Sequence, residues 1–224
     1  MDKELIEHLA SYLTPNRQAL FNSVLQQRTR YLTVVLEDIF QPQNASAVLR
    51  TCDCFGIQDV HIIENRNDFE VDREVAMGAS KWLSLKKYNQ LEQNSLEAIR
   101  QLKANGYRIV ATSPHINDQE LHNFDMNKGK AALVFGSELP GISEIIKTEA
   151  DEFLKIPMYG FTESFNISVS AAIILHHLTL KMKQDSAIEW NLSQEEQQEI
   201  KLEWIRRSIK RSELIEQRFR ENCK

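Results

Sequence analysis

The chain has 224 residues, 42% of them hydrophobic and 26% charged, a composition typical of globular proteins. No apolar run approaches the roughly 18 residues that span a bilayer, and the N-terminus lacks the basic start and apolar stretch of a secretory signal. The formal net charge of −5 argues against nucleic-acid binding unless Lys and Arg cluster locally. We therefore expect a soluble, cytoplasmic protein with one core domain and additions at its ends.

Two short helices are predicted at the start of the chain. Leu5, Leu9 and Leu13 recur at four-residue spacing, and Pro15 interrupts the pattern before a second apolar set begins at Leu20. We assign residues 1–30 to an N-terminal helical extension.

Six short segments rich in apolar and β-branched residues follow, and helical patterns separate them. They lie at 32–39, 60–64, 83–88, 108–113, 131–136 and 153–158. Strands that alternate with helices are typical of a parallel sheet covered on both faces. We therefore predict an α/β core over residues 31–184, with a mostly parallel six-stranded sheet and helices on both faces.

A C-terminal helical extension is predicted over residues 185–224. Ser193 and Glu196 have the spacing of a capping box, which predicts the start of one long helix. Its basic residues outnumber its acidic ones: Lys201, Arg206, Arg207, Lys210, Arg211, Arg218 and Arg220 face Glu203, Glu213 and Glu216. A nucleic-acid interface and a solvated helix face explain this excess equally well.

Several common kinds of site are not expected. Cys52 and Cys54 are too close in sequence to bridge within a helix, and we expect them and Cys223 to be free thiols. The six histidines, His115 among them, show no metal-ligand spacing, so no metal is expected. The sequence also lacks the glycine-rich phosphate loops of dinucleotide-binding and P-loop enzymes, and Ser137 lies outside a GxSxG motif.

Three other segments place polar residues or glycines just after predicted strands, where open α/β sheets bind ligands. The first, NASAVLR, puts Asn44 near a helix start and Arg50 about two turns later. Asn44 is either a helix cap or a functional residue, and Arg50 either a surface or a functional residue.

The second segment, LVFGSELPGIS, joins a strand to a glycine turn. Gly136 permits a close approach of backbone to a ligand, and Pro140 with Gly141 sets the turn, although turn chemistry alone also explains the pattern. The third segment, IPMYGFTESFNIS, begins at Ile156 and provides apolar side chains for a slot that suits an adenine ring.

Together, the three segments resemble the motifs of the SpoU/TrmH family of RNA ribose 2′-O-methyltransferases, within the SPOUT class. The resemblance covers about residues 32–183, and NASAVLRTCDCFGI, ALVFGSELPGIS and IPMYGFTESFNISVSAAIIL stand in the family's order and spacing. It implies a C-terminal deep trefoil knot, an exception to the rule that chains avoid knots. It also implies a homodimer with active sites close to the subunit interface.

The resemblance further implies roles for individual residues. It places S-adenosylmethionine in the knot, around Thr112, Gly136, Ile156, Met158 and Phe165, although Phe165 stands where leucine is more usual. It assigns catalysis to Arg50, which acts either as the base or as a stabiliser of the developing alkoxide, since a guanidinium stays protonated. The other catalytic positions match Asn44, Glu138 and Asn166, and Ser164 and Ser168 are expected to contact substrate.

The terminal helices resemble those of the family's tRNA enzymes, which methylate the D-loop guanosine at position 18. On this basis Arg207 and Arg211 are expected to contact tRNA. Two alternatives remain open: methylation of another tRNA or rRNA nucleotide, and a non-catalytic knotted RNA-binding protein.

Overall fold

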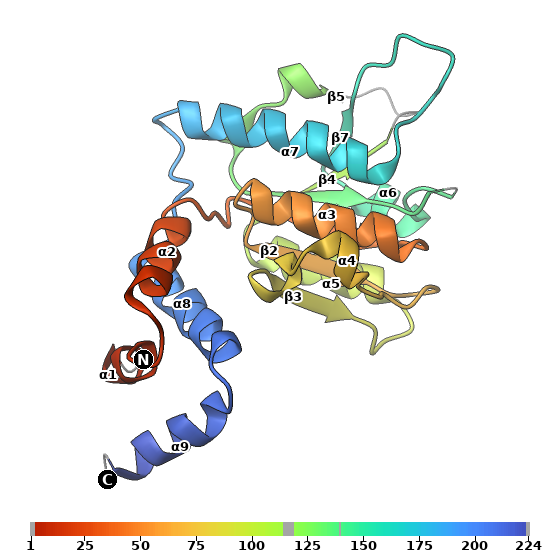
Figure 1. Ribbon diagram of the computed structural model, residues 1–224. Helices are drawn as coiled ribbons and strands as arrows, with labels where there is room; N and C mark the ends of the chain where they lie inside the picture. The colour runs from red at the N-terminus through yellow and green to blue at the C-terminus, as the bar shows by residue number, and fades with distance from the viewer. Residues whose placement is uncertain (1–2, 114–118, 139, 223–224) are drawn as a thin grey trace. The chain divides into compact units, whose positions relative to one another are not determined.

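The computed structural model describes residues 3–113, 119–138 and 140–222, which form two compact units (Figure 1). The larger unit, here called the core unit, comprises Thr29–Trp190. The smaller, here called the helical unit, brings the segment Met1–Arg28 together with Asn191–Lys224. The two ends of the chain therefore fold with each other.

A parallel sheet forms the centre of the core unit. Its strands are β1 (Leu32–Glu37), β2 (Asp59–Ile63), β3 (Ser84–Tyr88), β4 (Arg108–Thr112), β5 (Gln119–Glu120), β6 (Ala131–Phe135) and β7 (Glu152–Lys155). They are hydrogen-bonded in the order β3-β2-β1-β6-β4-β7-β5, and all pairings between these described strands are parallel. The sheet thus runs out of sequence order on one side of β1.

The six predicted strands are present, but the predicted number of strands is wrong, because the sheet has seven. The additional strand, β5, consists of Gln119 and Glu120 and pairs only with β7 at the edge of the sheet. The sequence did not predict β5, because two polar residues show no alternation of apolar side chains. Only backbone pairing to a neighbouring strand defines so short a strand.

Helices cover both faces of the sheet, as predicted. On one face α3 (Pro42–Cys54) packs against α7 (Ile167–Gln184), and on the other α5 (Asn94–Ala104) packs against α6 (Glu144–Glu149) (Figure 1). Side chains of β1 alternate between the two cores, with Val34 on the α3 and α7 side and Val35 on the α5 and α6 side. The remaining short elements are α4 (Arg73–Ala76), η1 (Ala79–Lys81), η2 (Leu121–Asn123) and η3 (Met126–Lys128).

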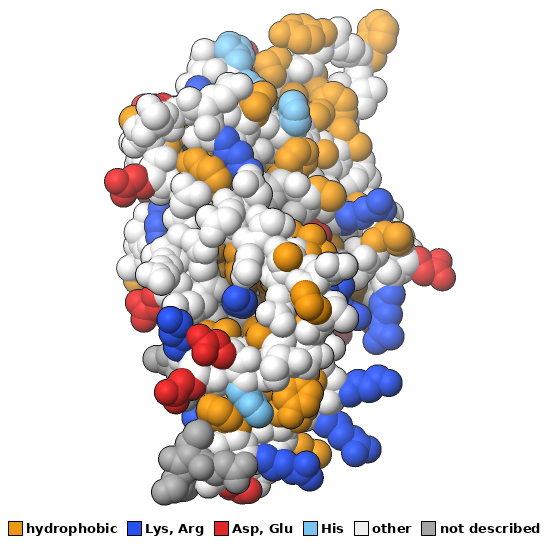
Figure 2. Space-filling model, turned by 60° about the vertical axis from the view of Figure 1, so that its left-hand side comes forward, with side chains coloured by type: hydrophobic (Ala, Val, Ile, Leu, Met, Phe, Trp, Pro, Cys, Tyr) orange, Lys and Arg blue, Asp and Glu red, His pale blue; other side chains and the backbone are white. Residues whose placement is uncertain are grey.

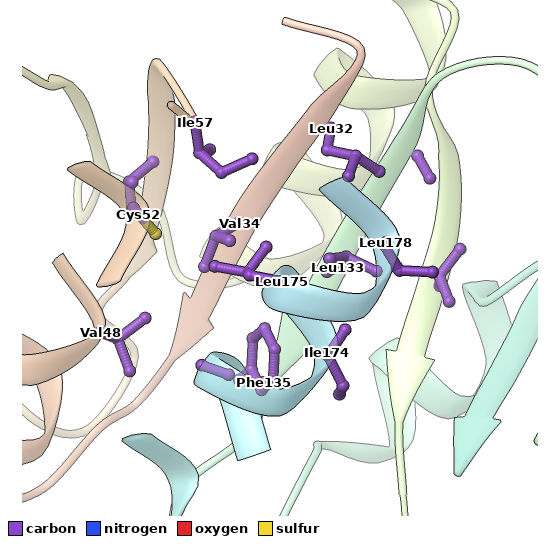
Figure 3. Packing of buried hydrophobic residues seen from close by; sticks show 14 of the residues in the cluster. Leu32, Val34, Val48, Cys52, Ile57, Leu133, Phe135, Ile174, Leu175 and Leu178 are labelled. Atoms are coloured by element: carbon purple, nitrogen blue, oxygen red, sulfur yellow. The ribbon is translucent and has the colours of Figure 1, made fainter. Parts of the chain in front are cut away.

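The packing of α7 on the sheet fixes the end of the chain's third motif. Leu175 and Leu178 lie over Val34 of β1 and Leu133 of β6, and all four side chains are buried (Figure 3). Burial of each such side chain contributes about 1.5–3 kcal/mol. These buried contacts hold the middle of α7 against the sheet.

Asn44 and Asn166 take different positions at the starts of α3 and α7. Gln41 occupies the cap position of α3 and Pro42 the first helical position, so Asn44 lies inside the helix and is not its cap. By contrast, Asn166 caps α7 and accepts a hydrogen bond from the Ser168 backbone N–H. The Asn44 side chain is consequently available for contacts with other elements.

The helical unit contains α1 (Lys3–Ala10), α2 (Pro15–Leu25), α8 (Gln194–Ser208) and α9 (Ser212–Asn222). The predicted helix break at Pro15 and the capping box of Ser193 and Glu196 are both confirmed. The prediction of one long final helix is wrong, because α8 ends where Ile209 is extended, and Arg211 then adopts a left-handed conformation with φ 59° before α9 begins. Phe21 and Trp204 meet edge to face inside the unit.

Both described cysteines are free, Cys52 buried and Cys54 exposed, whereas Cys223 and His115 lie outside the described residues. No helix in the described part of the chain is long and apolar enough to cross a membrane.

Candidate active site

A pocket of about 690 Å³ lies at the carboxyl ends of β4, β6 and β7. The five residues expected around the cofactor all line it: Thr112, Gly136, Ile156, Met158 and Phe165. Because parallel strands end at the same edge of a sheet, segments far apart in sequence meet there. We call this pocket the β6–β7 pocket.

Gly136 is required by the backbone around the pocket. A Cβ atom at this position would lie 2.2 Å from the carbonyl carbon of Gly141 and 2.3 Å from the backbone nitrogen of Ile142. The backbone of Ser137 pairs with that of Gly141 in an antiparallel bridge, which holds the loop this closely. The sequence predicted a close approach at Gly136, and the structure identifies a partner in the protein's own chain.

A chain of hydrogen bonds joins three motif residues. The Asn44 side-chain amide donates to Glu138 Oε1 at 2.7 Å, and the Asn44 carbonyl oxygen accepts from Asn166 Nδ2 at 3.0 Å. Asn166 Oδ1 in turn accepts from the backbone N–H of Ser168 at 2.8 Å and from its hydroxyl at 2.6 Å. We call this set the Glu138–Asn44–Asn166 chain.

These bonds fix the orientation of a carboxylate at the pocket wall. Glu138 and Asn166 line the β6–β7 pocket, whereas Asn44 lies behind them and is 8% exposed. The second oxygen of Glu138 is 3.5 Å from the backbone nitrogen of Phe40, a weak contact. Glu138 therefore retains capacity to accept a hydrogen bond from a hydroxyl group in the pocket.

Arg50 does not join this group within one chain. It is exposed on α3, it does not line the β6–β7 pocket, and it makes no hydrogen bond or ion pair with any described residue. Ser164 lines the pocket, whereas Ser168 contacts it only through Asn166. The geometry thus gathers the residues expected to bind the cofactor and three of the four catalytic candidates.

Arg207 and Arg211 belong to the helical unit. Arg207 forms an ion pair with Glu203 at 3.3 Å, and Arg211 occupies the turn between α8 and α9. Both side chains are at the surface of that unit.

The sequence did not indicate several polar residues of the pocket. Ser113, Lys147 and Ser170 line it, and Lys147 also forms an ion pair with Glu144 at 2.6 Å. A single lysine on a short helix resembles any solvated residue, so no sequence signal distinguishes it. Among the residues that the structure describes, no cluster of three or more His, Cys, Asp or Glu side chains is placed to hold a metal ion.

A parallel sheet with a mainly apolar pocket and an oriented carboxylate at its carboxyl edge defines an enzyme that binds a small organic ligand there. The chain belongs to the SpoU rRNA Methylase family, whose model matches residues 31–176.

Individual relatives resemble the chain over most of its length. It is 41% identical over 219 residues to a tRNA (guanosine(18)-2′-O)-methyltransferase of Borreliella burgdorferi, covering 96% of this chain and 98% of the relative. A protein of the same name from Thermus thermophilus is 34% identical over 87% of this chain and 98% of its own. Among solved structures, a TrmH/SpoU tRNA modifying enzyme of A. aeolicus matches with a TM-score of 0.76 and 28% identity, covering 88% of this chain and 98% of that one.

Proposed function

We propose that this protein is a tRNA (guanosine(18)-2′-O)-methyltransferase, which transfers a methyl group to the ribose 2′-hydroxyl of the D-loop guanosine. The observation that carries this proposal is the 41% identity to a relative of that name across 96% of the chain, terminal helices included. The match thus extends beyond the catalytic core to the segments that differ most between members of a family.

We propose S-adenosylmethionine as the methyl donor, held in the β6–β7 pocket. The pocket has about 690 Å³, a size common for small-ligand sites, and its apolar side chains Ile156, Met158 and Phe165 suit an adenine ring. Thr112 donates its hydroxyl to the Val134 carbonyl at 2.9 Å, which holds the end of β4 beside β6. When bound, the donor supplies an electrophilic methyl group on its sulfonium.

The residues of the chain have distinct roles in this proposal. A ribose hydroxyl is too weakly acidic to ionise unaided, so the reaction needs a group that accepts or stabilises charge. Glu138, oriented by Asn44 and Asn166, accepts a hydrogen bond from the hydroxyl and takes its proton on Oε2 as the oxygen is methylated. Arg50 stabilises the developing alkoxide, since a guanidinium remains protonated near neutral pH.

A homodimer and a trefoil knot complete the proposal. Large apolar side chains of the β7–α7 segment and of α7 are exposed, namely Tyr159, Phe161, Phe165, Val169 and Leu180. Figure 2 shows hydrophobic side chains gathered in the upper part of the view, at the height of these elements in Figure 1. Burial against a second copy removes this apolar surface from water. Arg50 is exposed and lies outside the pocket of its own chain, which supports an active site completed by a residue from the second copy.

The order of the strands supports the trefoil knot. Strand β7 lies between β4 and β5, which are consecutive along the chain, and this position favours a threaded C-terminal segment.

We propose that the helical unit contributes to tRNA binding through Arg207 and Arg211, with Ser164 and Ser168 nearer the target nucleotide. A group of Lys and Arg side chains lies on one side of the lowest part of Figure 2, where the helical unit is drawn. Such a group provides the local positive charge that phosphate contacts need despite the negative net charge of the chain. We also propose a cytoplasmic location, because the proposed substrate is tRNA.

The decisive experiment is methyl transfer from labelled S-adenosylmethionine to an unmodified tRNA transcript, with the product mapped by digestion and mass spectrometry. We expect 2′-O-methylguanosine at position 18. Label at another tRNA or rRNA nucleotide would mean that the protein is a 2′-O-methyltransferase with a different target. Absence of label in all RNAs, with tRNA still bound, would mean that the protein is a non-catalytic RNA-binding protein.

A further inference from the structure

A second pocket of about 700 Å³ lies on the other side of the β6–α6 loop. We call it the β1–β6 pocket. The two pockets share Ser137, Glu138, Pro140, Gly141 and Ile142 as a common wall. The other walls of the β1–β6 pocket come from the segments after β1, β2 and β3, which contribute Phe40, Asn65, Asn67 and Glu92 among others. The second motif segment provides the common wall, but nothing in the sequence indicated a pocket on this side of it.

The topology of the sheet places the β1–β6 pocket where α/β sheets bind ligands. β1 and β6 are neighbours, but the helix after β1 (α3) and the helix after β6 (α6) cover opposite faces of the sheet. The two connections therefore diverge at the carboxyl edge and leave a crevice between them. The proposed cofactor site uses a different part of this edge, so this crevice is available to another ligand.

Phe40 gives the pocket an exposed aromatic surface. This side chain is 70% exposed although it lines a pocket, and its backbone nitrogen is 3.5 Å from Glu138 Oε2. Unstacked bases of RNA bind by stacking on aromatic side chains. Phe40 does not line the β6–β7 pocket, so stacking on it would not displace the cofactor.

Hydrogen bonds within the protein hold two carboxylates of the pocket, and a third carboxylate is left to bind a ligand. Glu37 is buried and accepts hydrogen bonds from Ser95 and from both the backbone and hydroxyl of Ser143. The carboxylate of Asp38 accepts from the backbone N–H groups of Asn65 and Arg66. Glu92 is exposed and has no hydrogen bond or ion pair with the described residues, so its carboxylate is free to accept from the N–H groups of a purine edge.

We propose that the β1–β6 pocket binds the nucleobase of the methyl-acceptor nucleotide, turned out of the RNA and stacked on Phe40. The ribose of that nucleotide then lies at the shared wall, beside Glu138, with its 2′-hydroxyl directed to the β6–β7 pocket. This assignment rests on the proposed function, because it requires a nucleotide substrate whose ribose reacts. Enzymes that carry out chemistry on a nucleobase take the base out of its stack and hold it in a pocket, and the proposal applies the same arrangement to chemistry on the ribose.

The test uses full-length protein and a tRNA transcript with a fluorescent guanine analogue, 6-methylisoxanthopterin, at position 18. Indole quenches such a base when the two stack, so Phe40→Trp should lower its fluorescence on binding well below the level with the unchanged protein. Met77→Trp is the matched control, because Met77 is also 70% exposed but does not line either pocket. A second transcript carries the analogue at the neighbouring nucleotide 19.

A parallel measurement compares Phe40→Ala with Phe40→Tyr. Loss of one stacking contact should weaken tRNA binding roughly ten-fold or more and raise the KM for tRNA, and tyrosine should restore both. Affinity for S-adenosylmethionine should not change.

Equal quenching by Phe40→Trp and Met77→Trp, or quenching at nucleotide 19 and not at 18, would overturn the assignment of the pocket. Unchanged tRNA binding and KM in Phe40→Ala would also overturn it. Failure of the unchanged protein to methylate tRNA would instead contradict the proposed function, because the fluorescence signal needs binding but no methyl transfer.

Discussion

The Asn44 side chain in α3 donates a hydrogen bond of 2.7 Å to Glu138 in the loop after β6, although 94 positions separate the two residues. The same asparagine accepts from Asn166, 122 positions away. One nearly buried amide therefore connects the three segments that resemble family motifs.

This connection predicts that Asn44→Ala lowers the rate of methyl transfer about 10- to 100-fold, since a hydrogen bond to a charged group contributes about 1.5–3 kcal/mol. Cofactor affinity should change little, because Asn44 does not line the pocket. Single-turnover kinetics and titration calorimetry measure the two effects. Asn127→Ala, which breaks an amide–carboxylate bond to Asp185 elsewhere, is the matched control. A rate equal to that of the control would contradict this role for Asn44.

Arg50→Ala should abolish methyl transfer, and binding of S-adenosylmethionine should persist. Arg50 is exposed and does not line the β6–β7 pocket, so its removal leaves that pocket intact. Arg50→Lys should restore little methyl-transfer activity, because an ammonium group lacks the planar, two-pronged donor geometry of a guanidinium. Labelled methyl transfer and calorimetry provide the readouts, and Arg100→Ala, at an exposed position of α5, serves as the control. Substantial turnover by Arg50→Ala would remove this residue from the mechanism.

Gly136→Ala should weaken cofactor binding more than ten-fold. The added Cβ would lie 2.2–2.3 Å from backbone atoms of Gly141 and Ile142, so the loop that walls both pockets must move. Gly160→Ala is the control, because a Cβ atom there has no atom within 4 Å. Calorimetric titration of both variants with S-adenosylmethionine measures the two affinities. Equal affinities would contradict the prediction and show that the loop accommodates the added Cβ atom.

Charge reversal at Arg207 and Arg211 should weaken tRNA binding and reduce its dependence on salt. Each lost phosphate contact lowers the slope of log affinity against log salt by about 1. Filter binding between low and physiological salt measures this slope, with cofactor affinity as the internal control. The same tRNA affinity before and after reversal would restrict α8 and its following turn to a packing role.

Stability should fall as the pH drops from about 6.5 to about 4. Burial, with a smaller contribution from the Lys86 charge, lowers the pKa of His61 from 6.5 to about 4. Between these values the unfolded chain binds a proton at His61 that the folded chain does not, so acid favours unfolding by up to about 3 kcal/mol. Denaturant unfolding across this pH range should show a smaller loss for His61→Asn, which retains a polar atom towards the Tyr88 hydroxyl, 2.9 Å from His61 Nδ1. The same pH slope in both proteins would contradict the prediction.

The strands were predictable because each buried strand carries its own apolar pattern. Val34 and Val35, for example, point to opposite cores, as the alternation along any strand requires. Gln119 and Glu120 carry no such pattern, and only their pairing with β7 makes them a strand. The break between α8 and α9 was equally hard to predict, since neither the extended Ile209 nor the left-handed Arg211 is a glycine or proline that would mark it in the sequence.

The residues expected to bind the cofactor were predicted from motif resemblance, and the structure gathers them in one pocket. Resemblance assigned Asn44 and Glu138 to one site, but the bond between them depends on how α3 and the β6–α6 loop meet at the sheet edge. The β1–β6 pocket depends in the same way on the divergence of two connections.

The sequence by itself determined the α/β class, the helical ends and the segments that carry the chemistry, because these depend on local periodicity and on residue types at fixed spacing. The tertiary structure alone decided the order of the strands, the Glu138–Asn44–Asn166 chain, the separation of Arg50 from the pocket of its own chain, and the presence of a second pocket. These features arise from contacts between residues tens to more than a hundred positions apart, and such contacts form only when the whole sheet and its helices pack together.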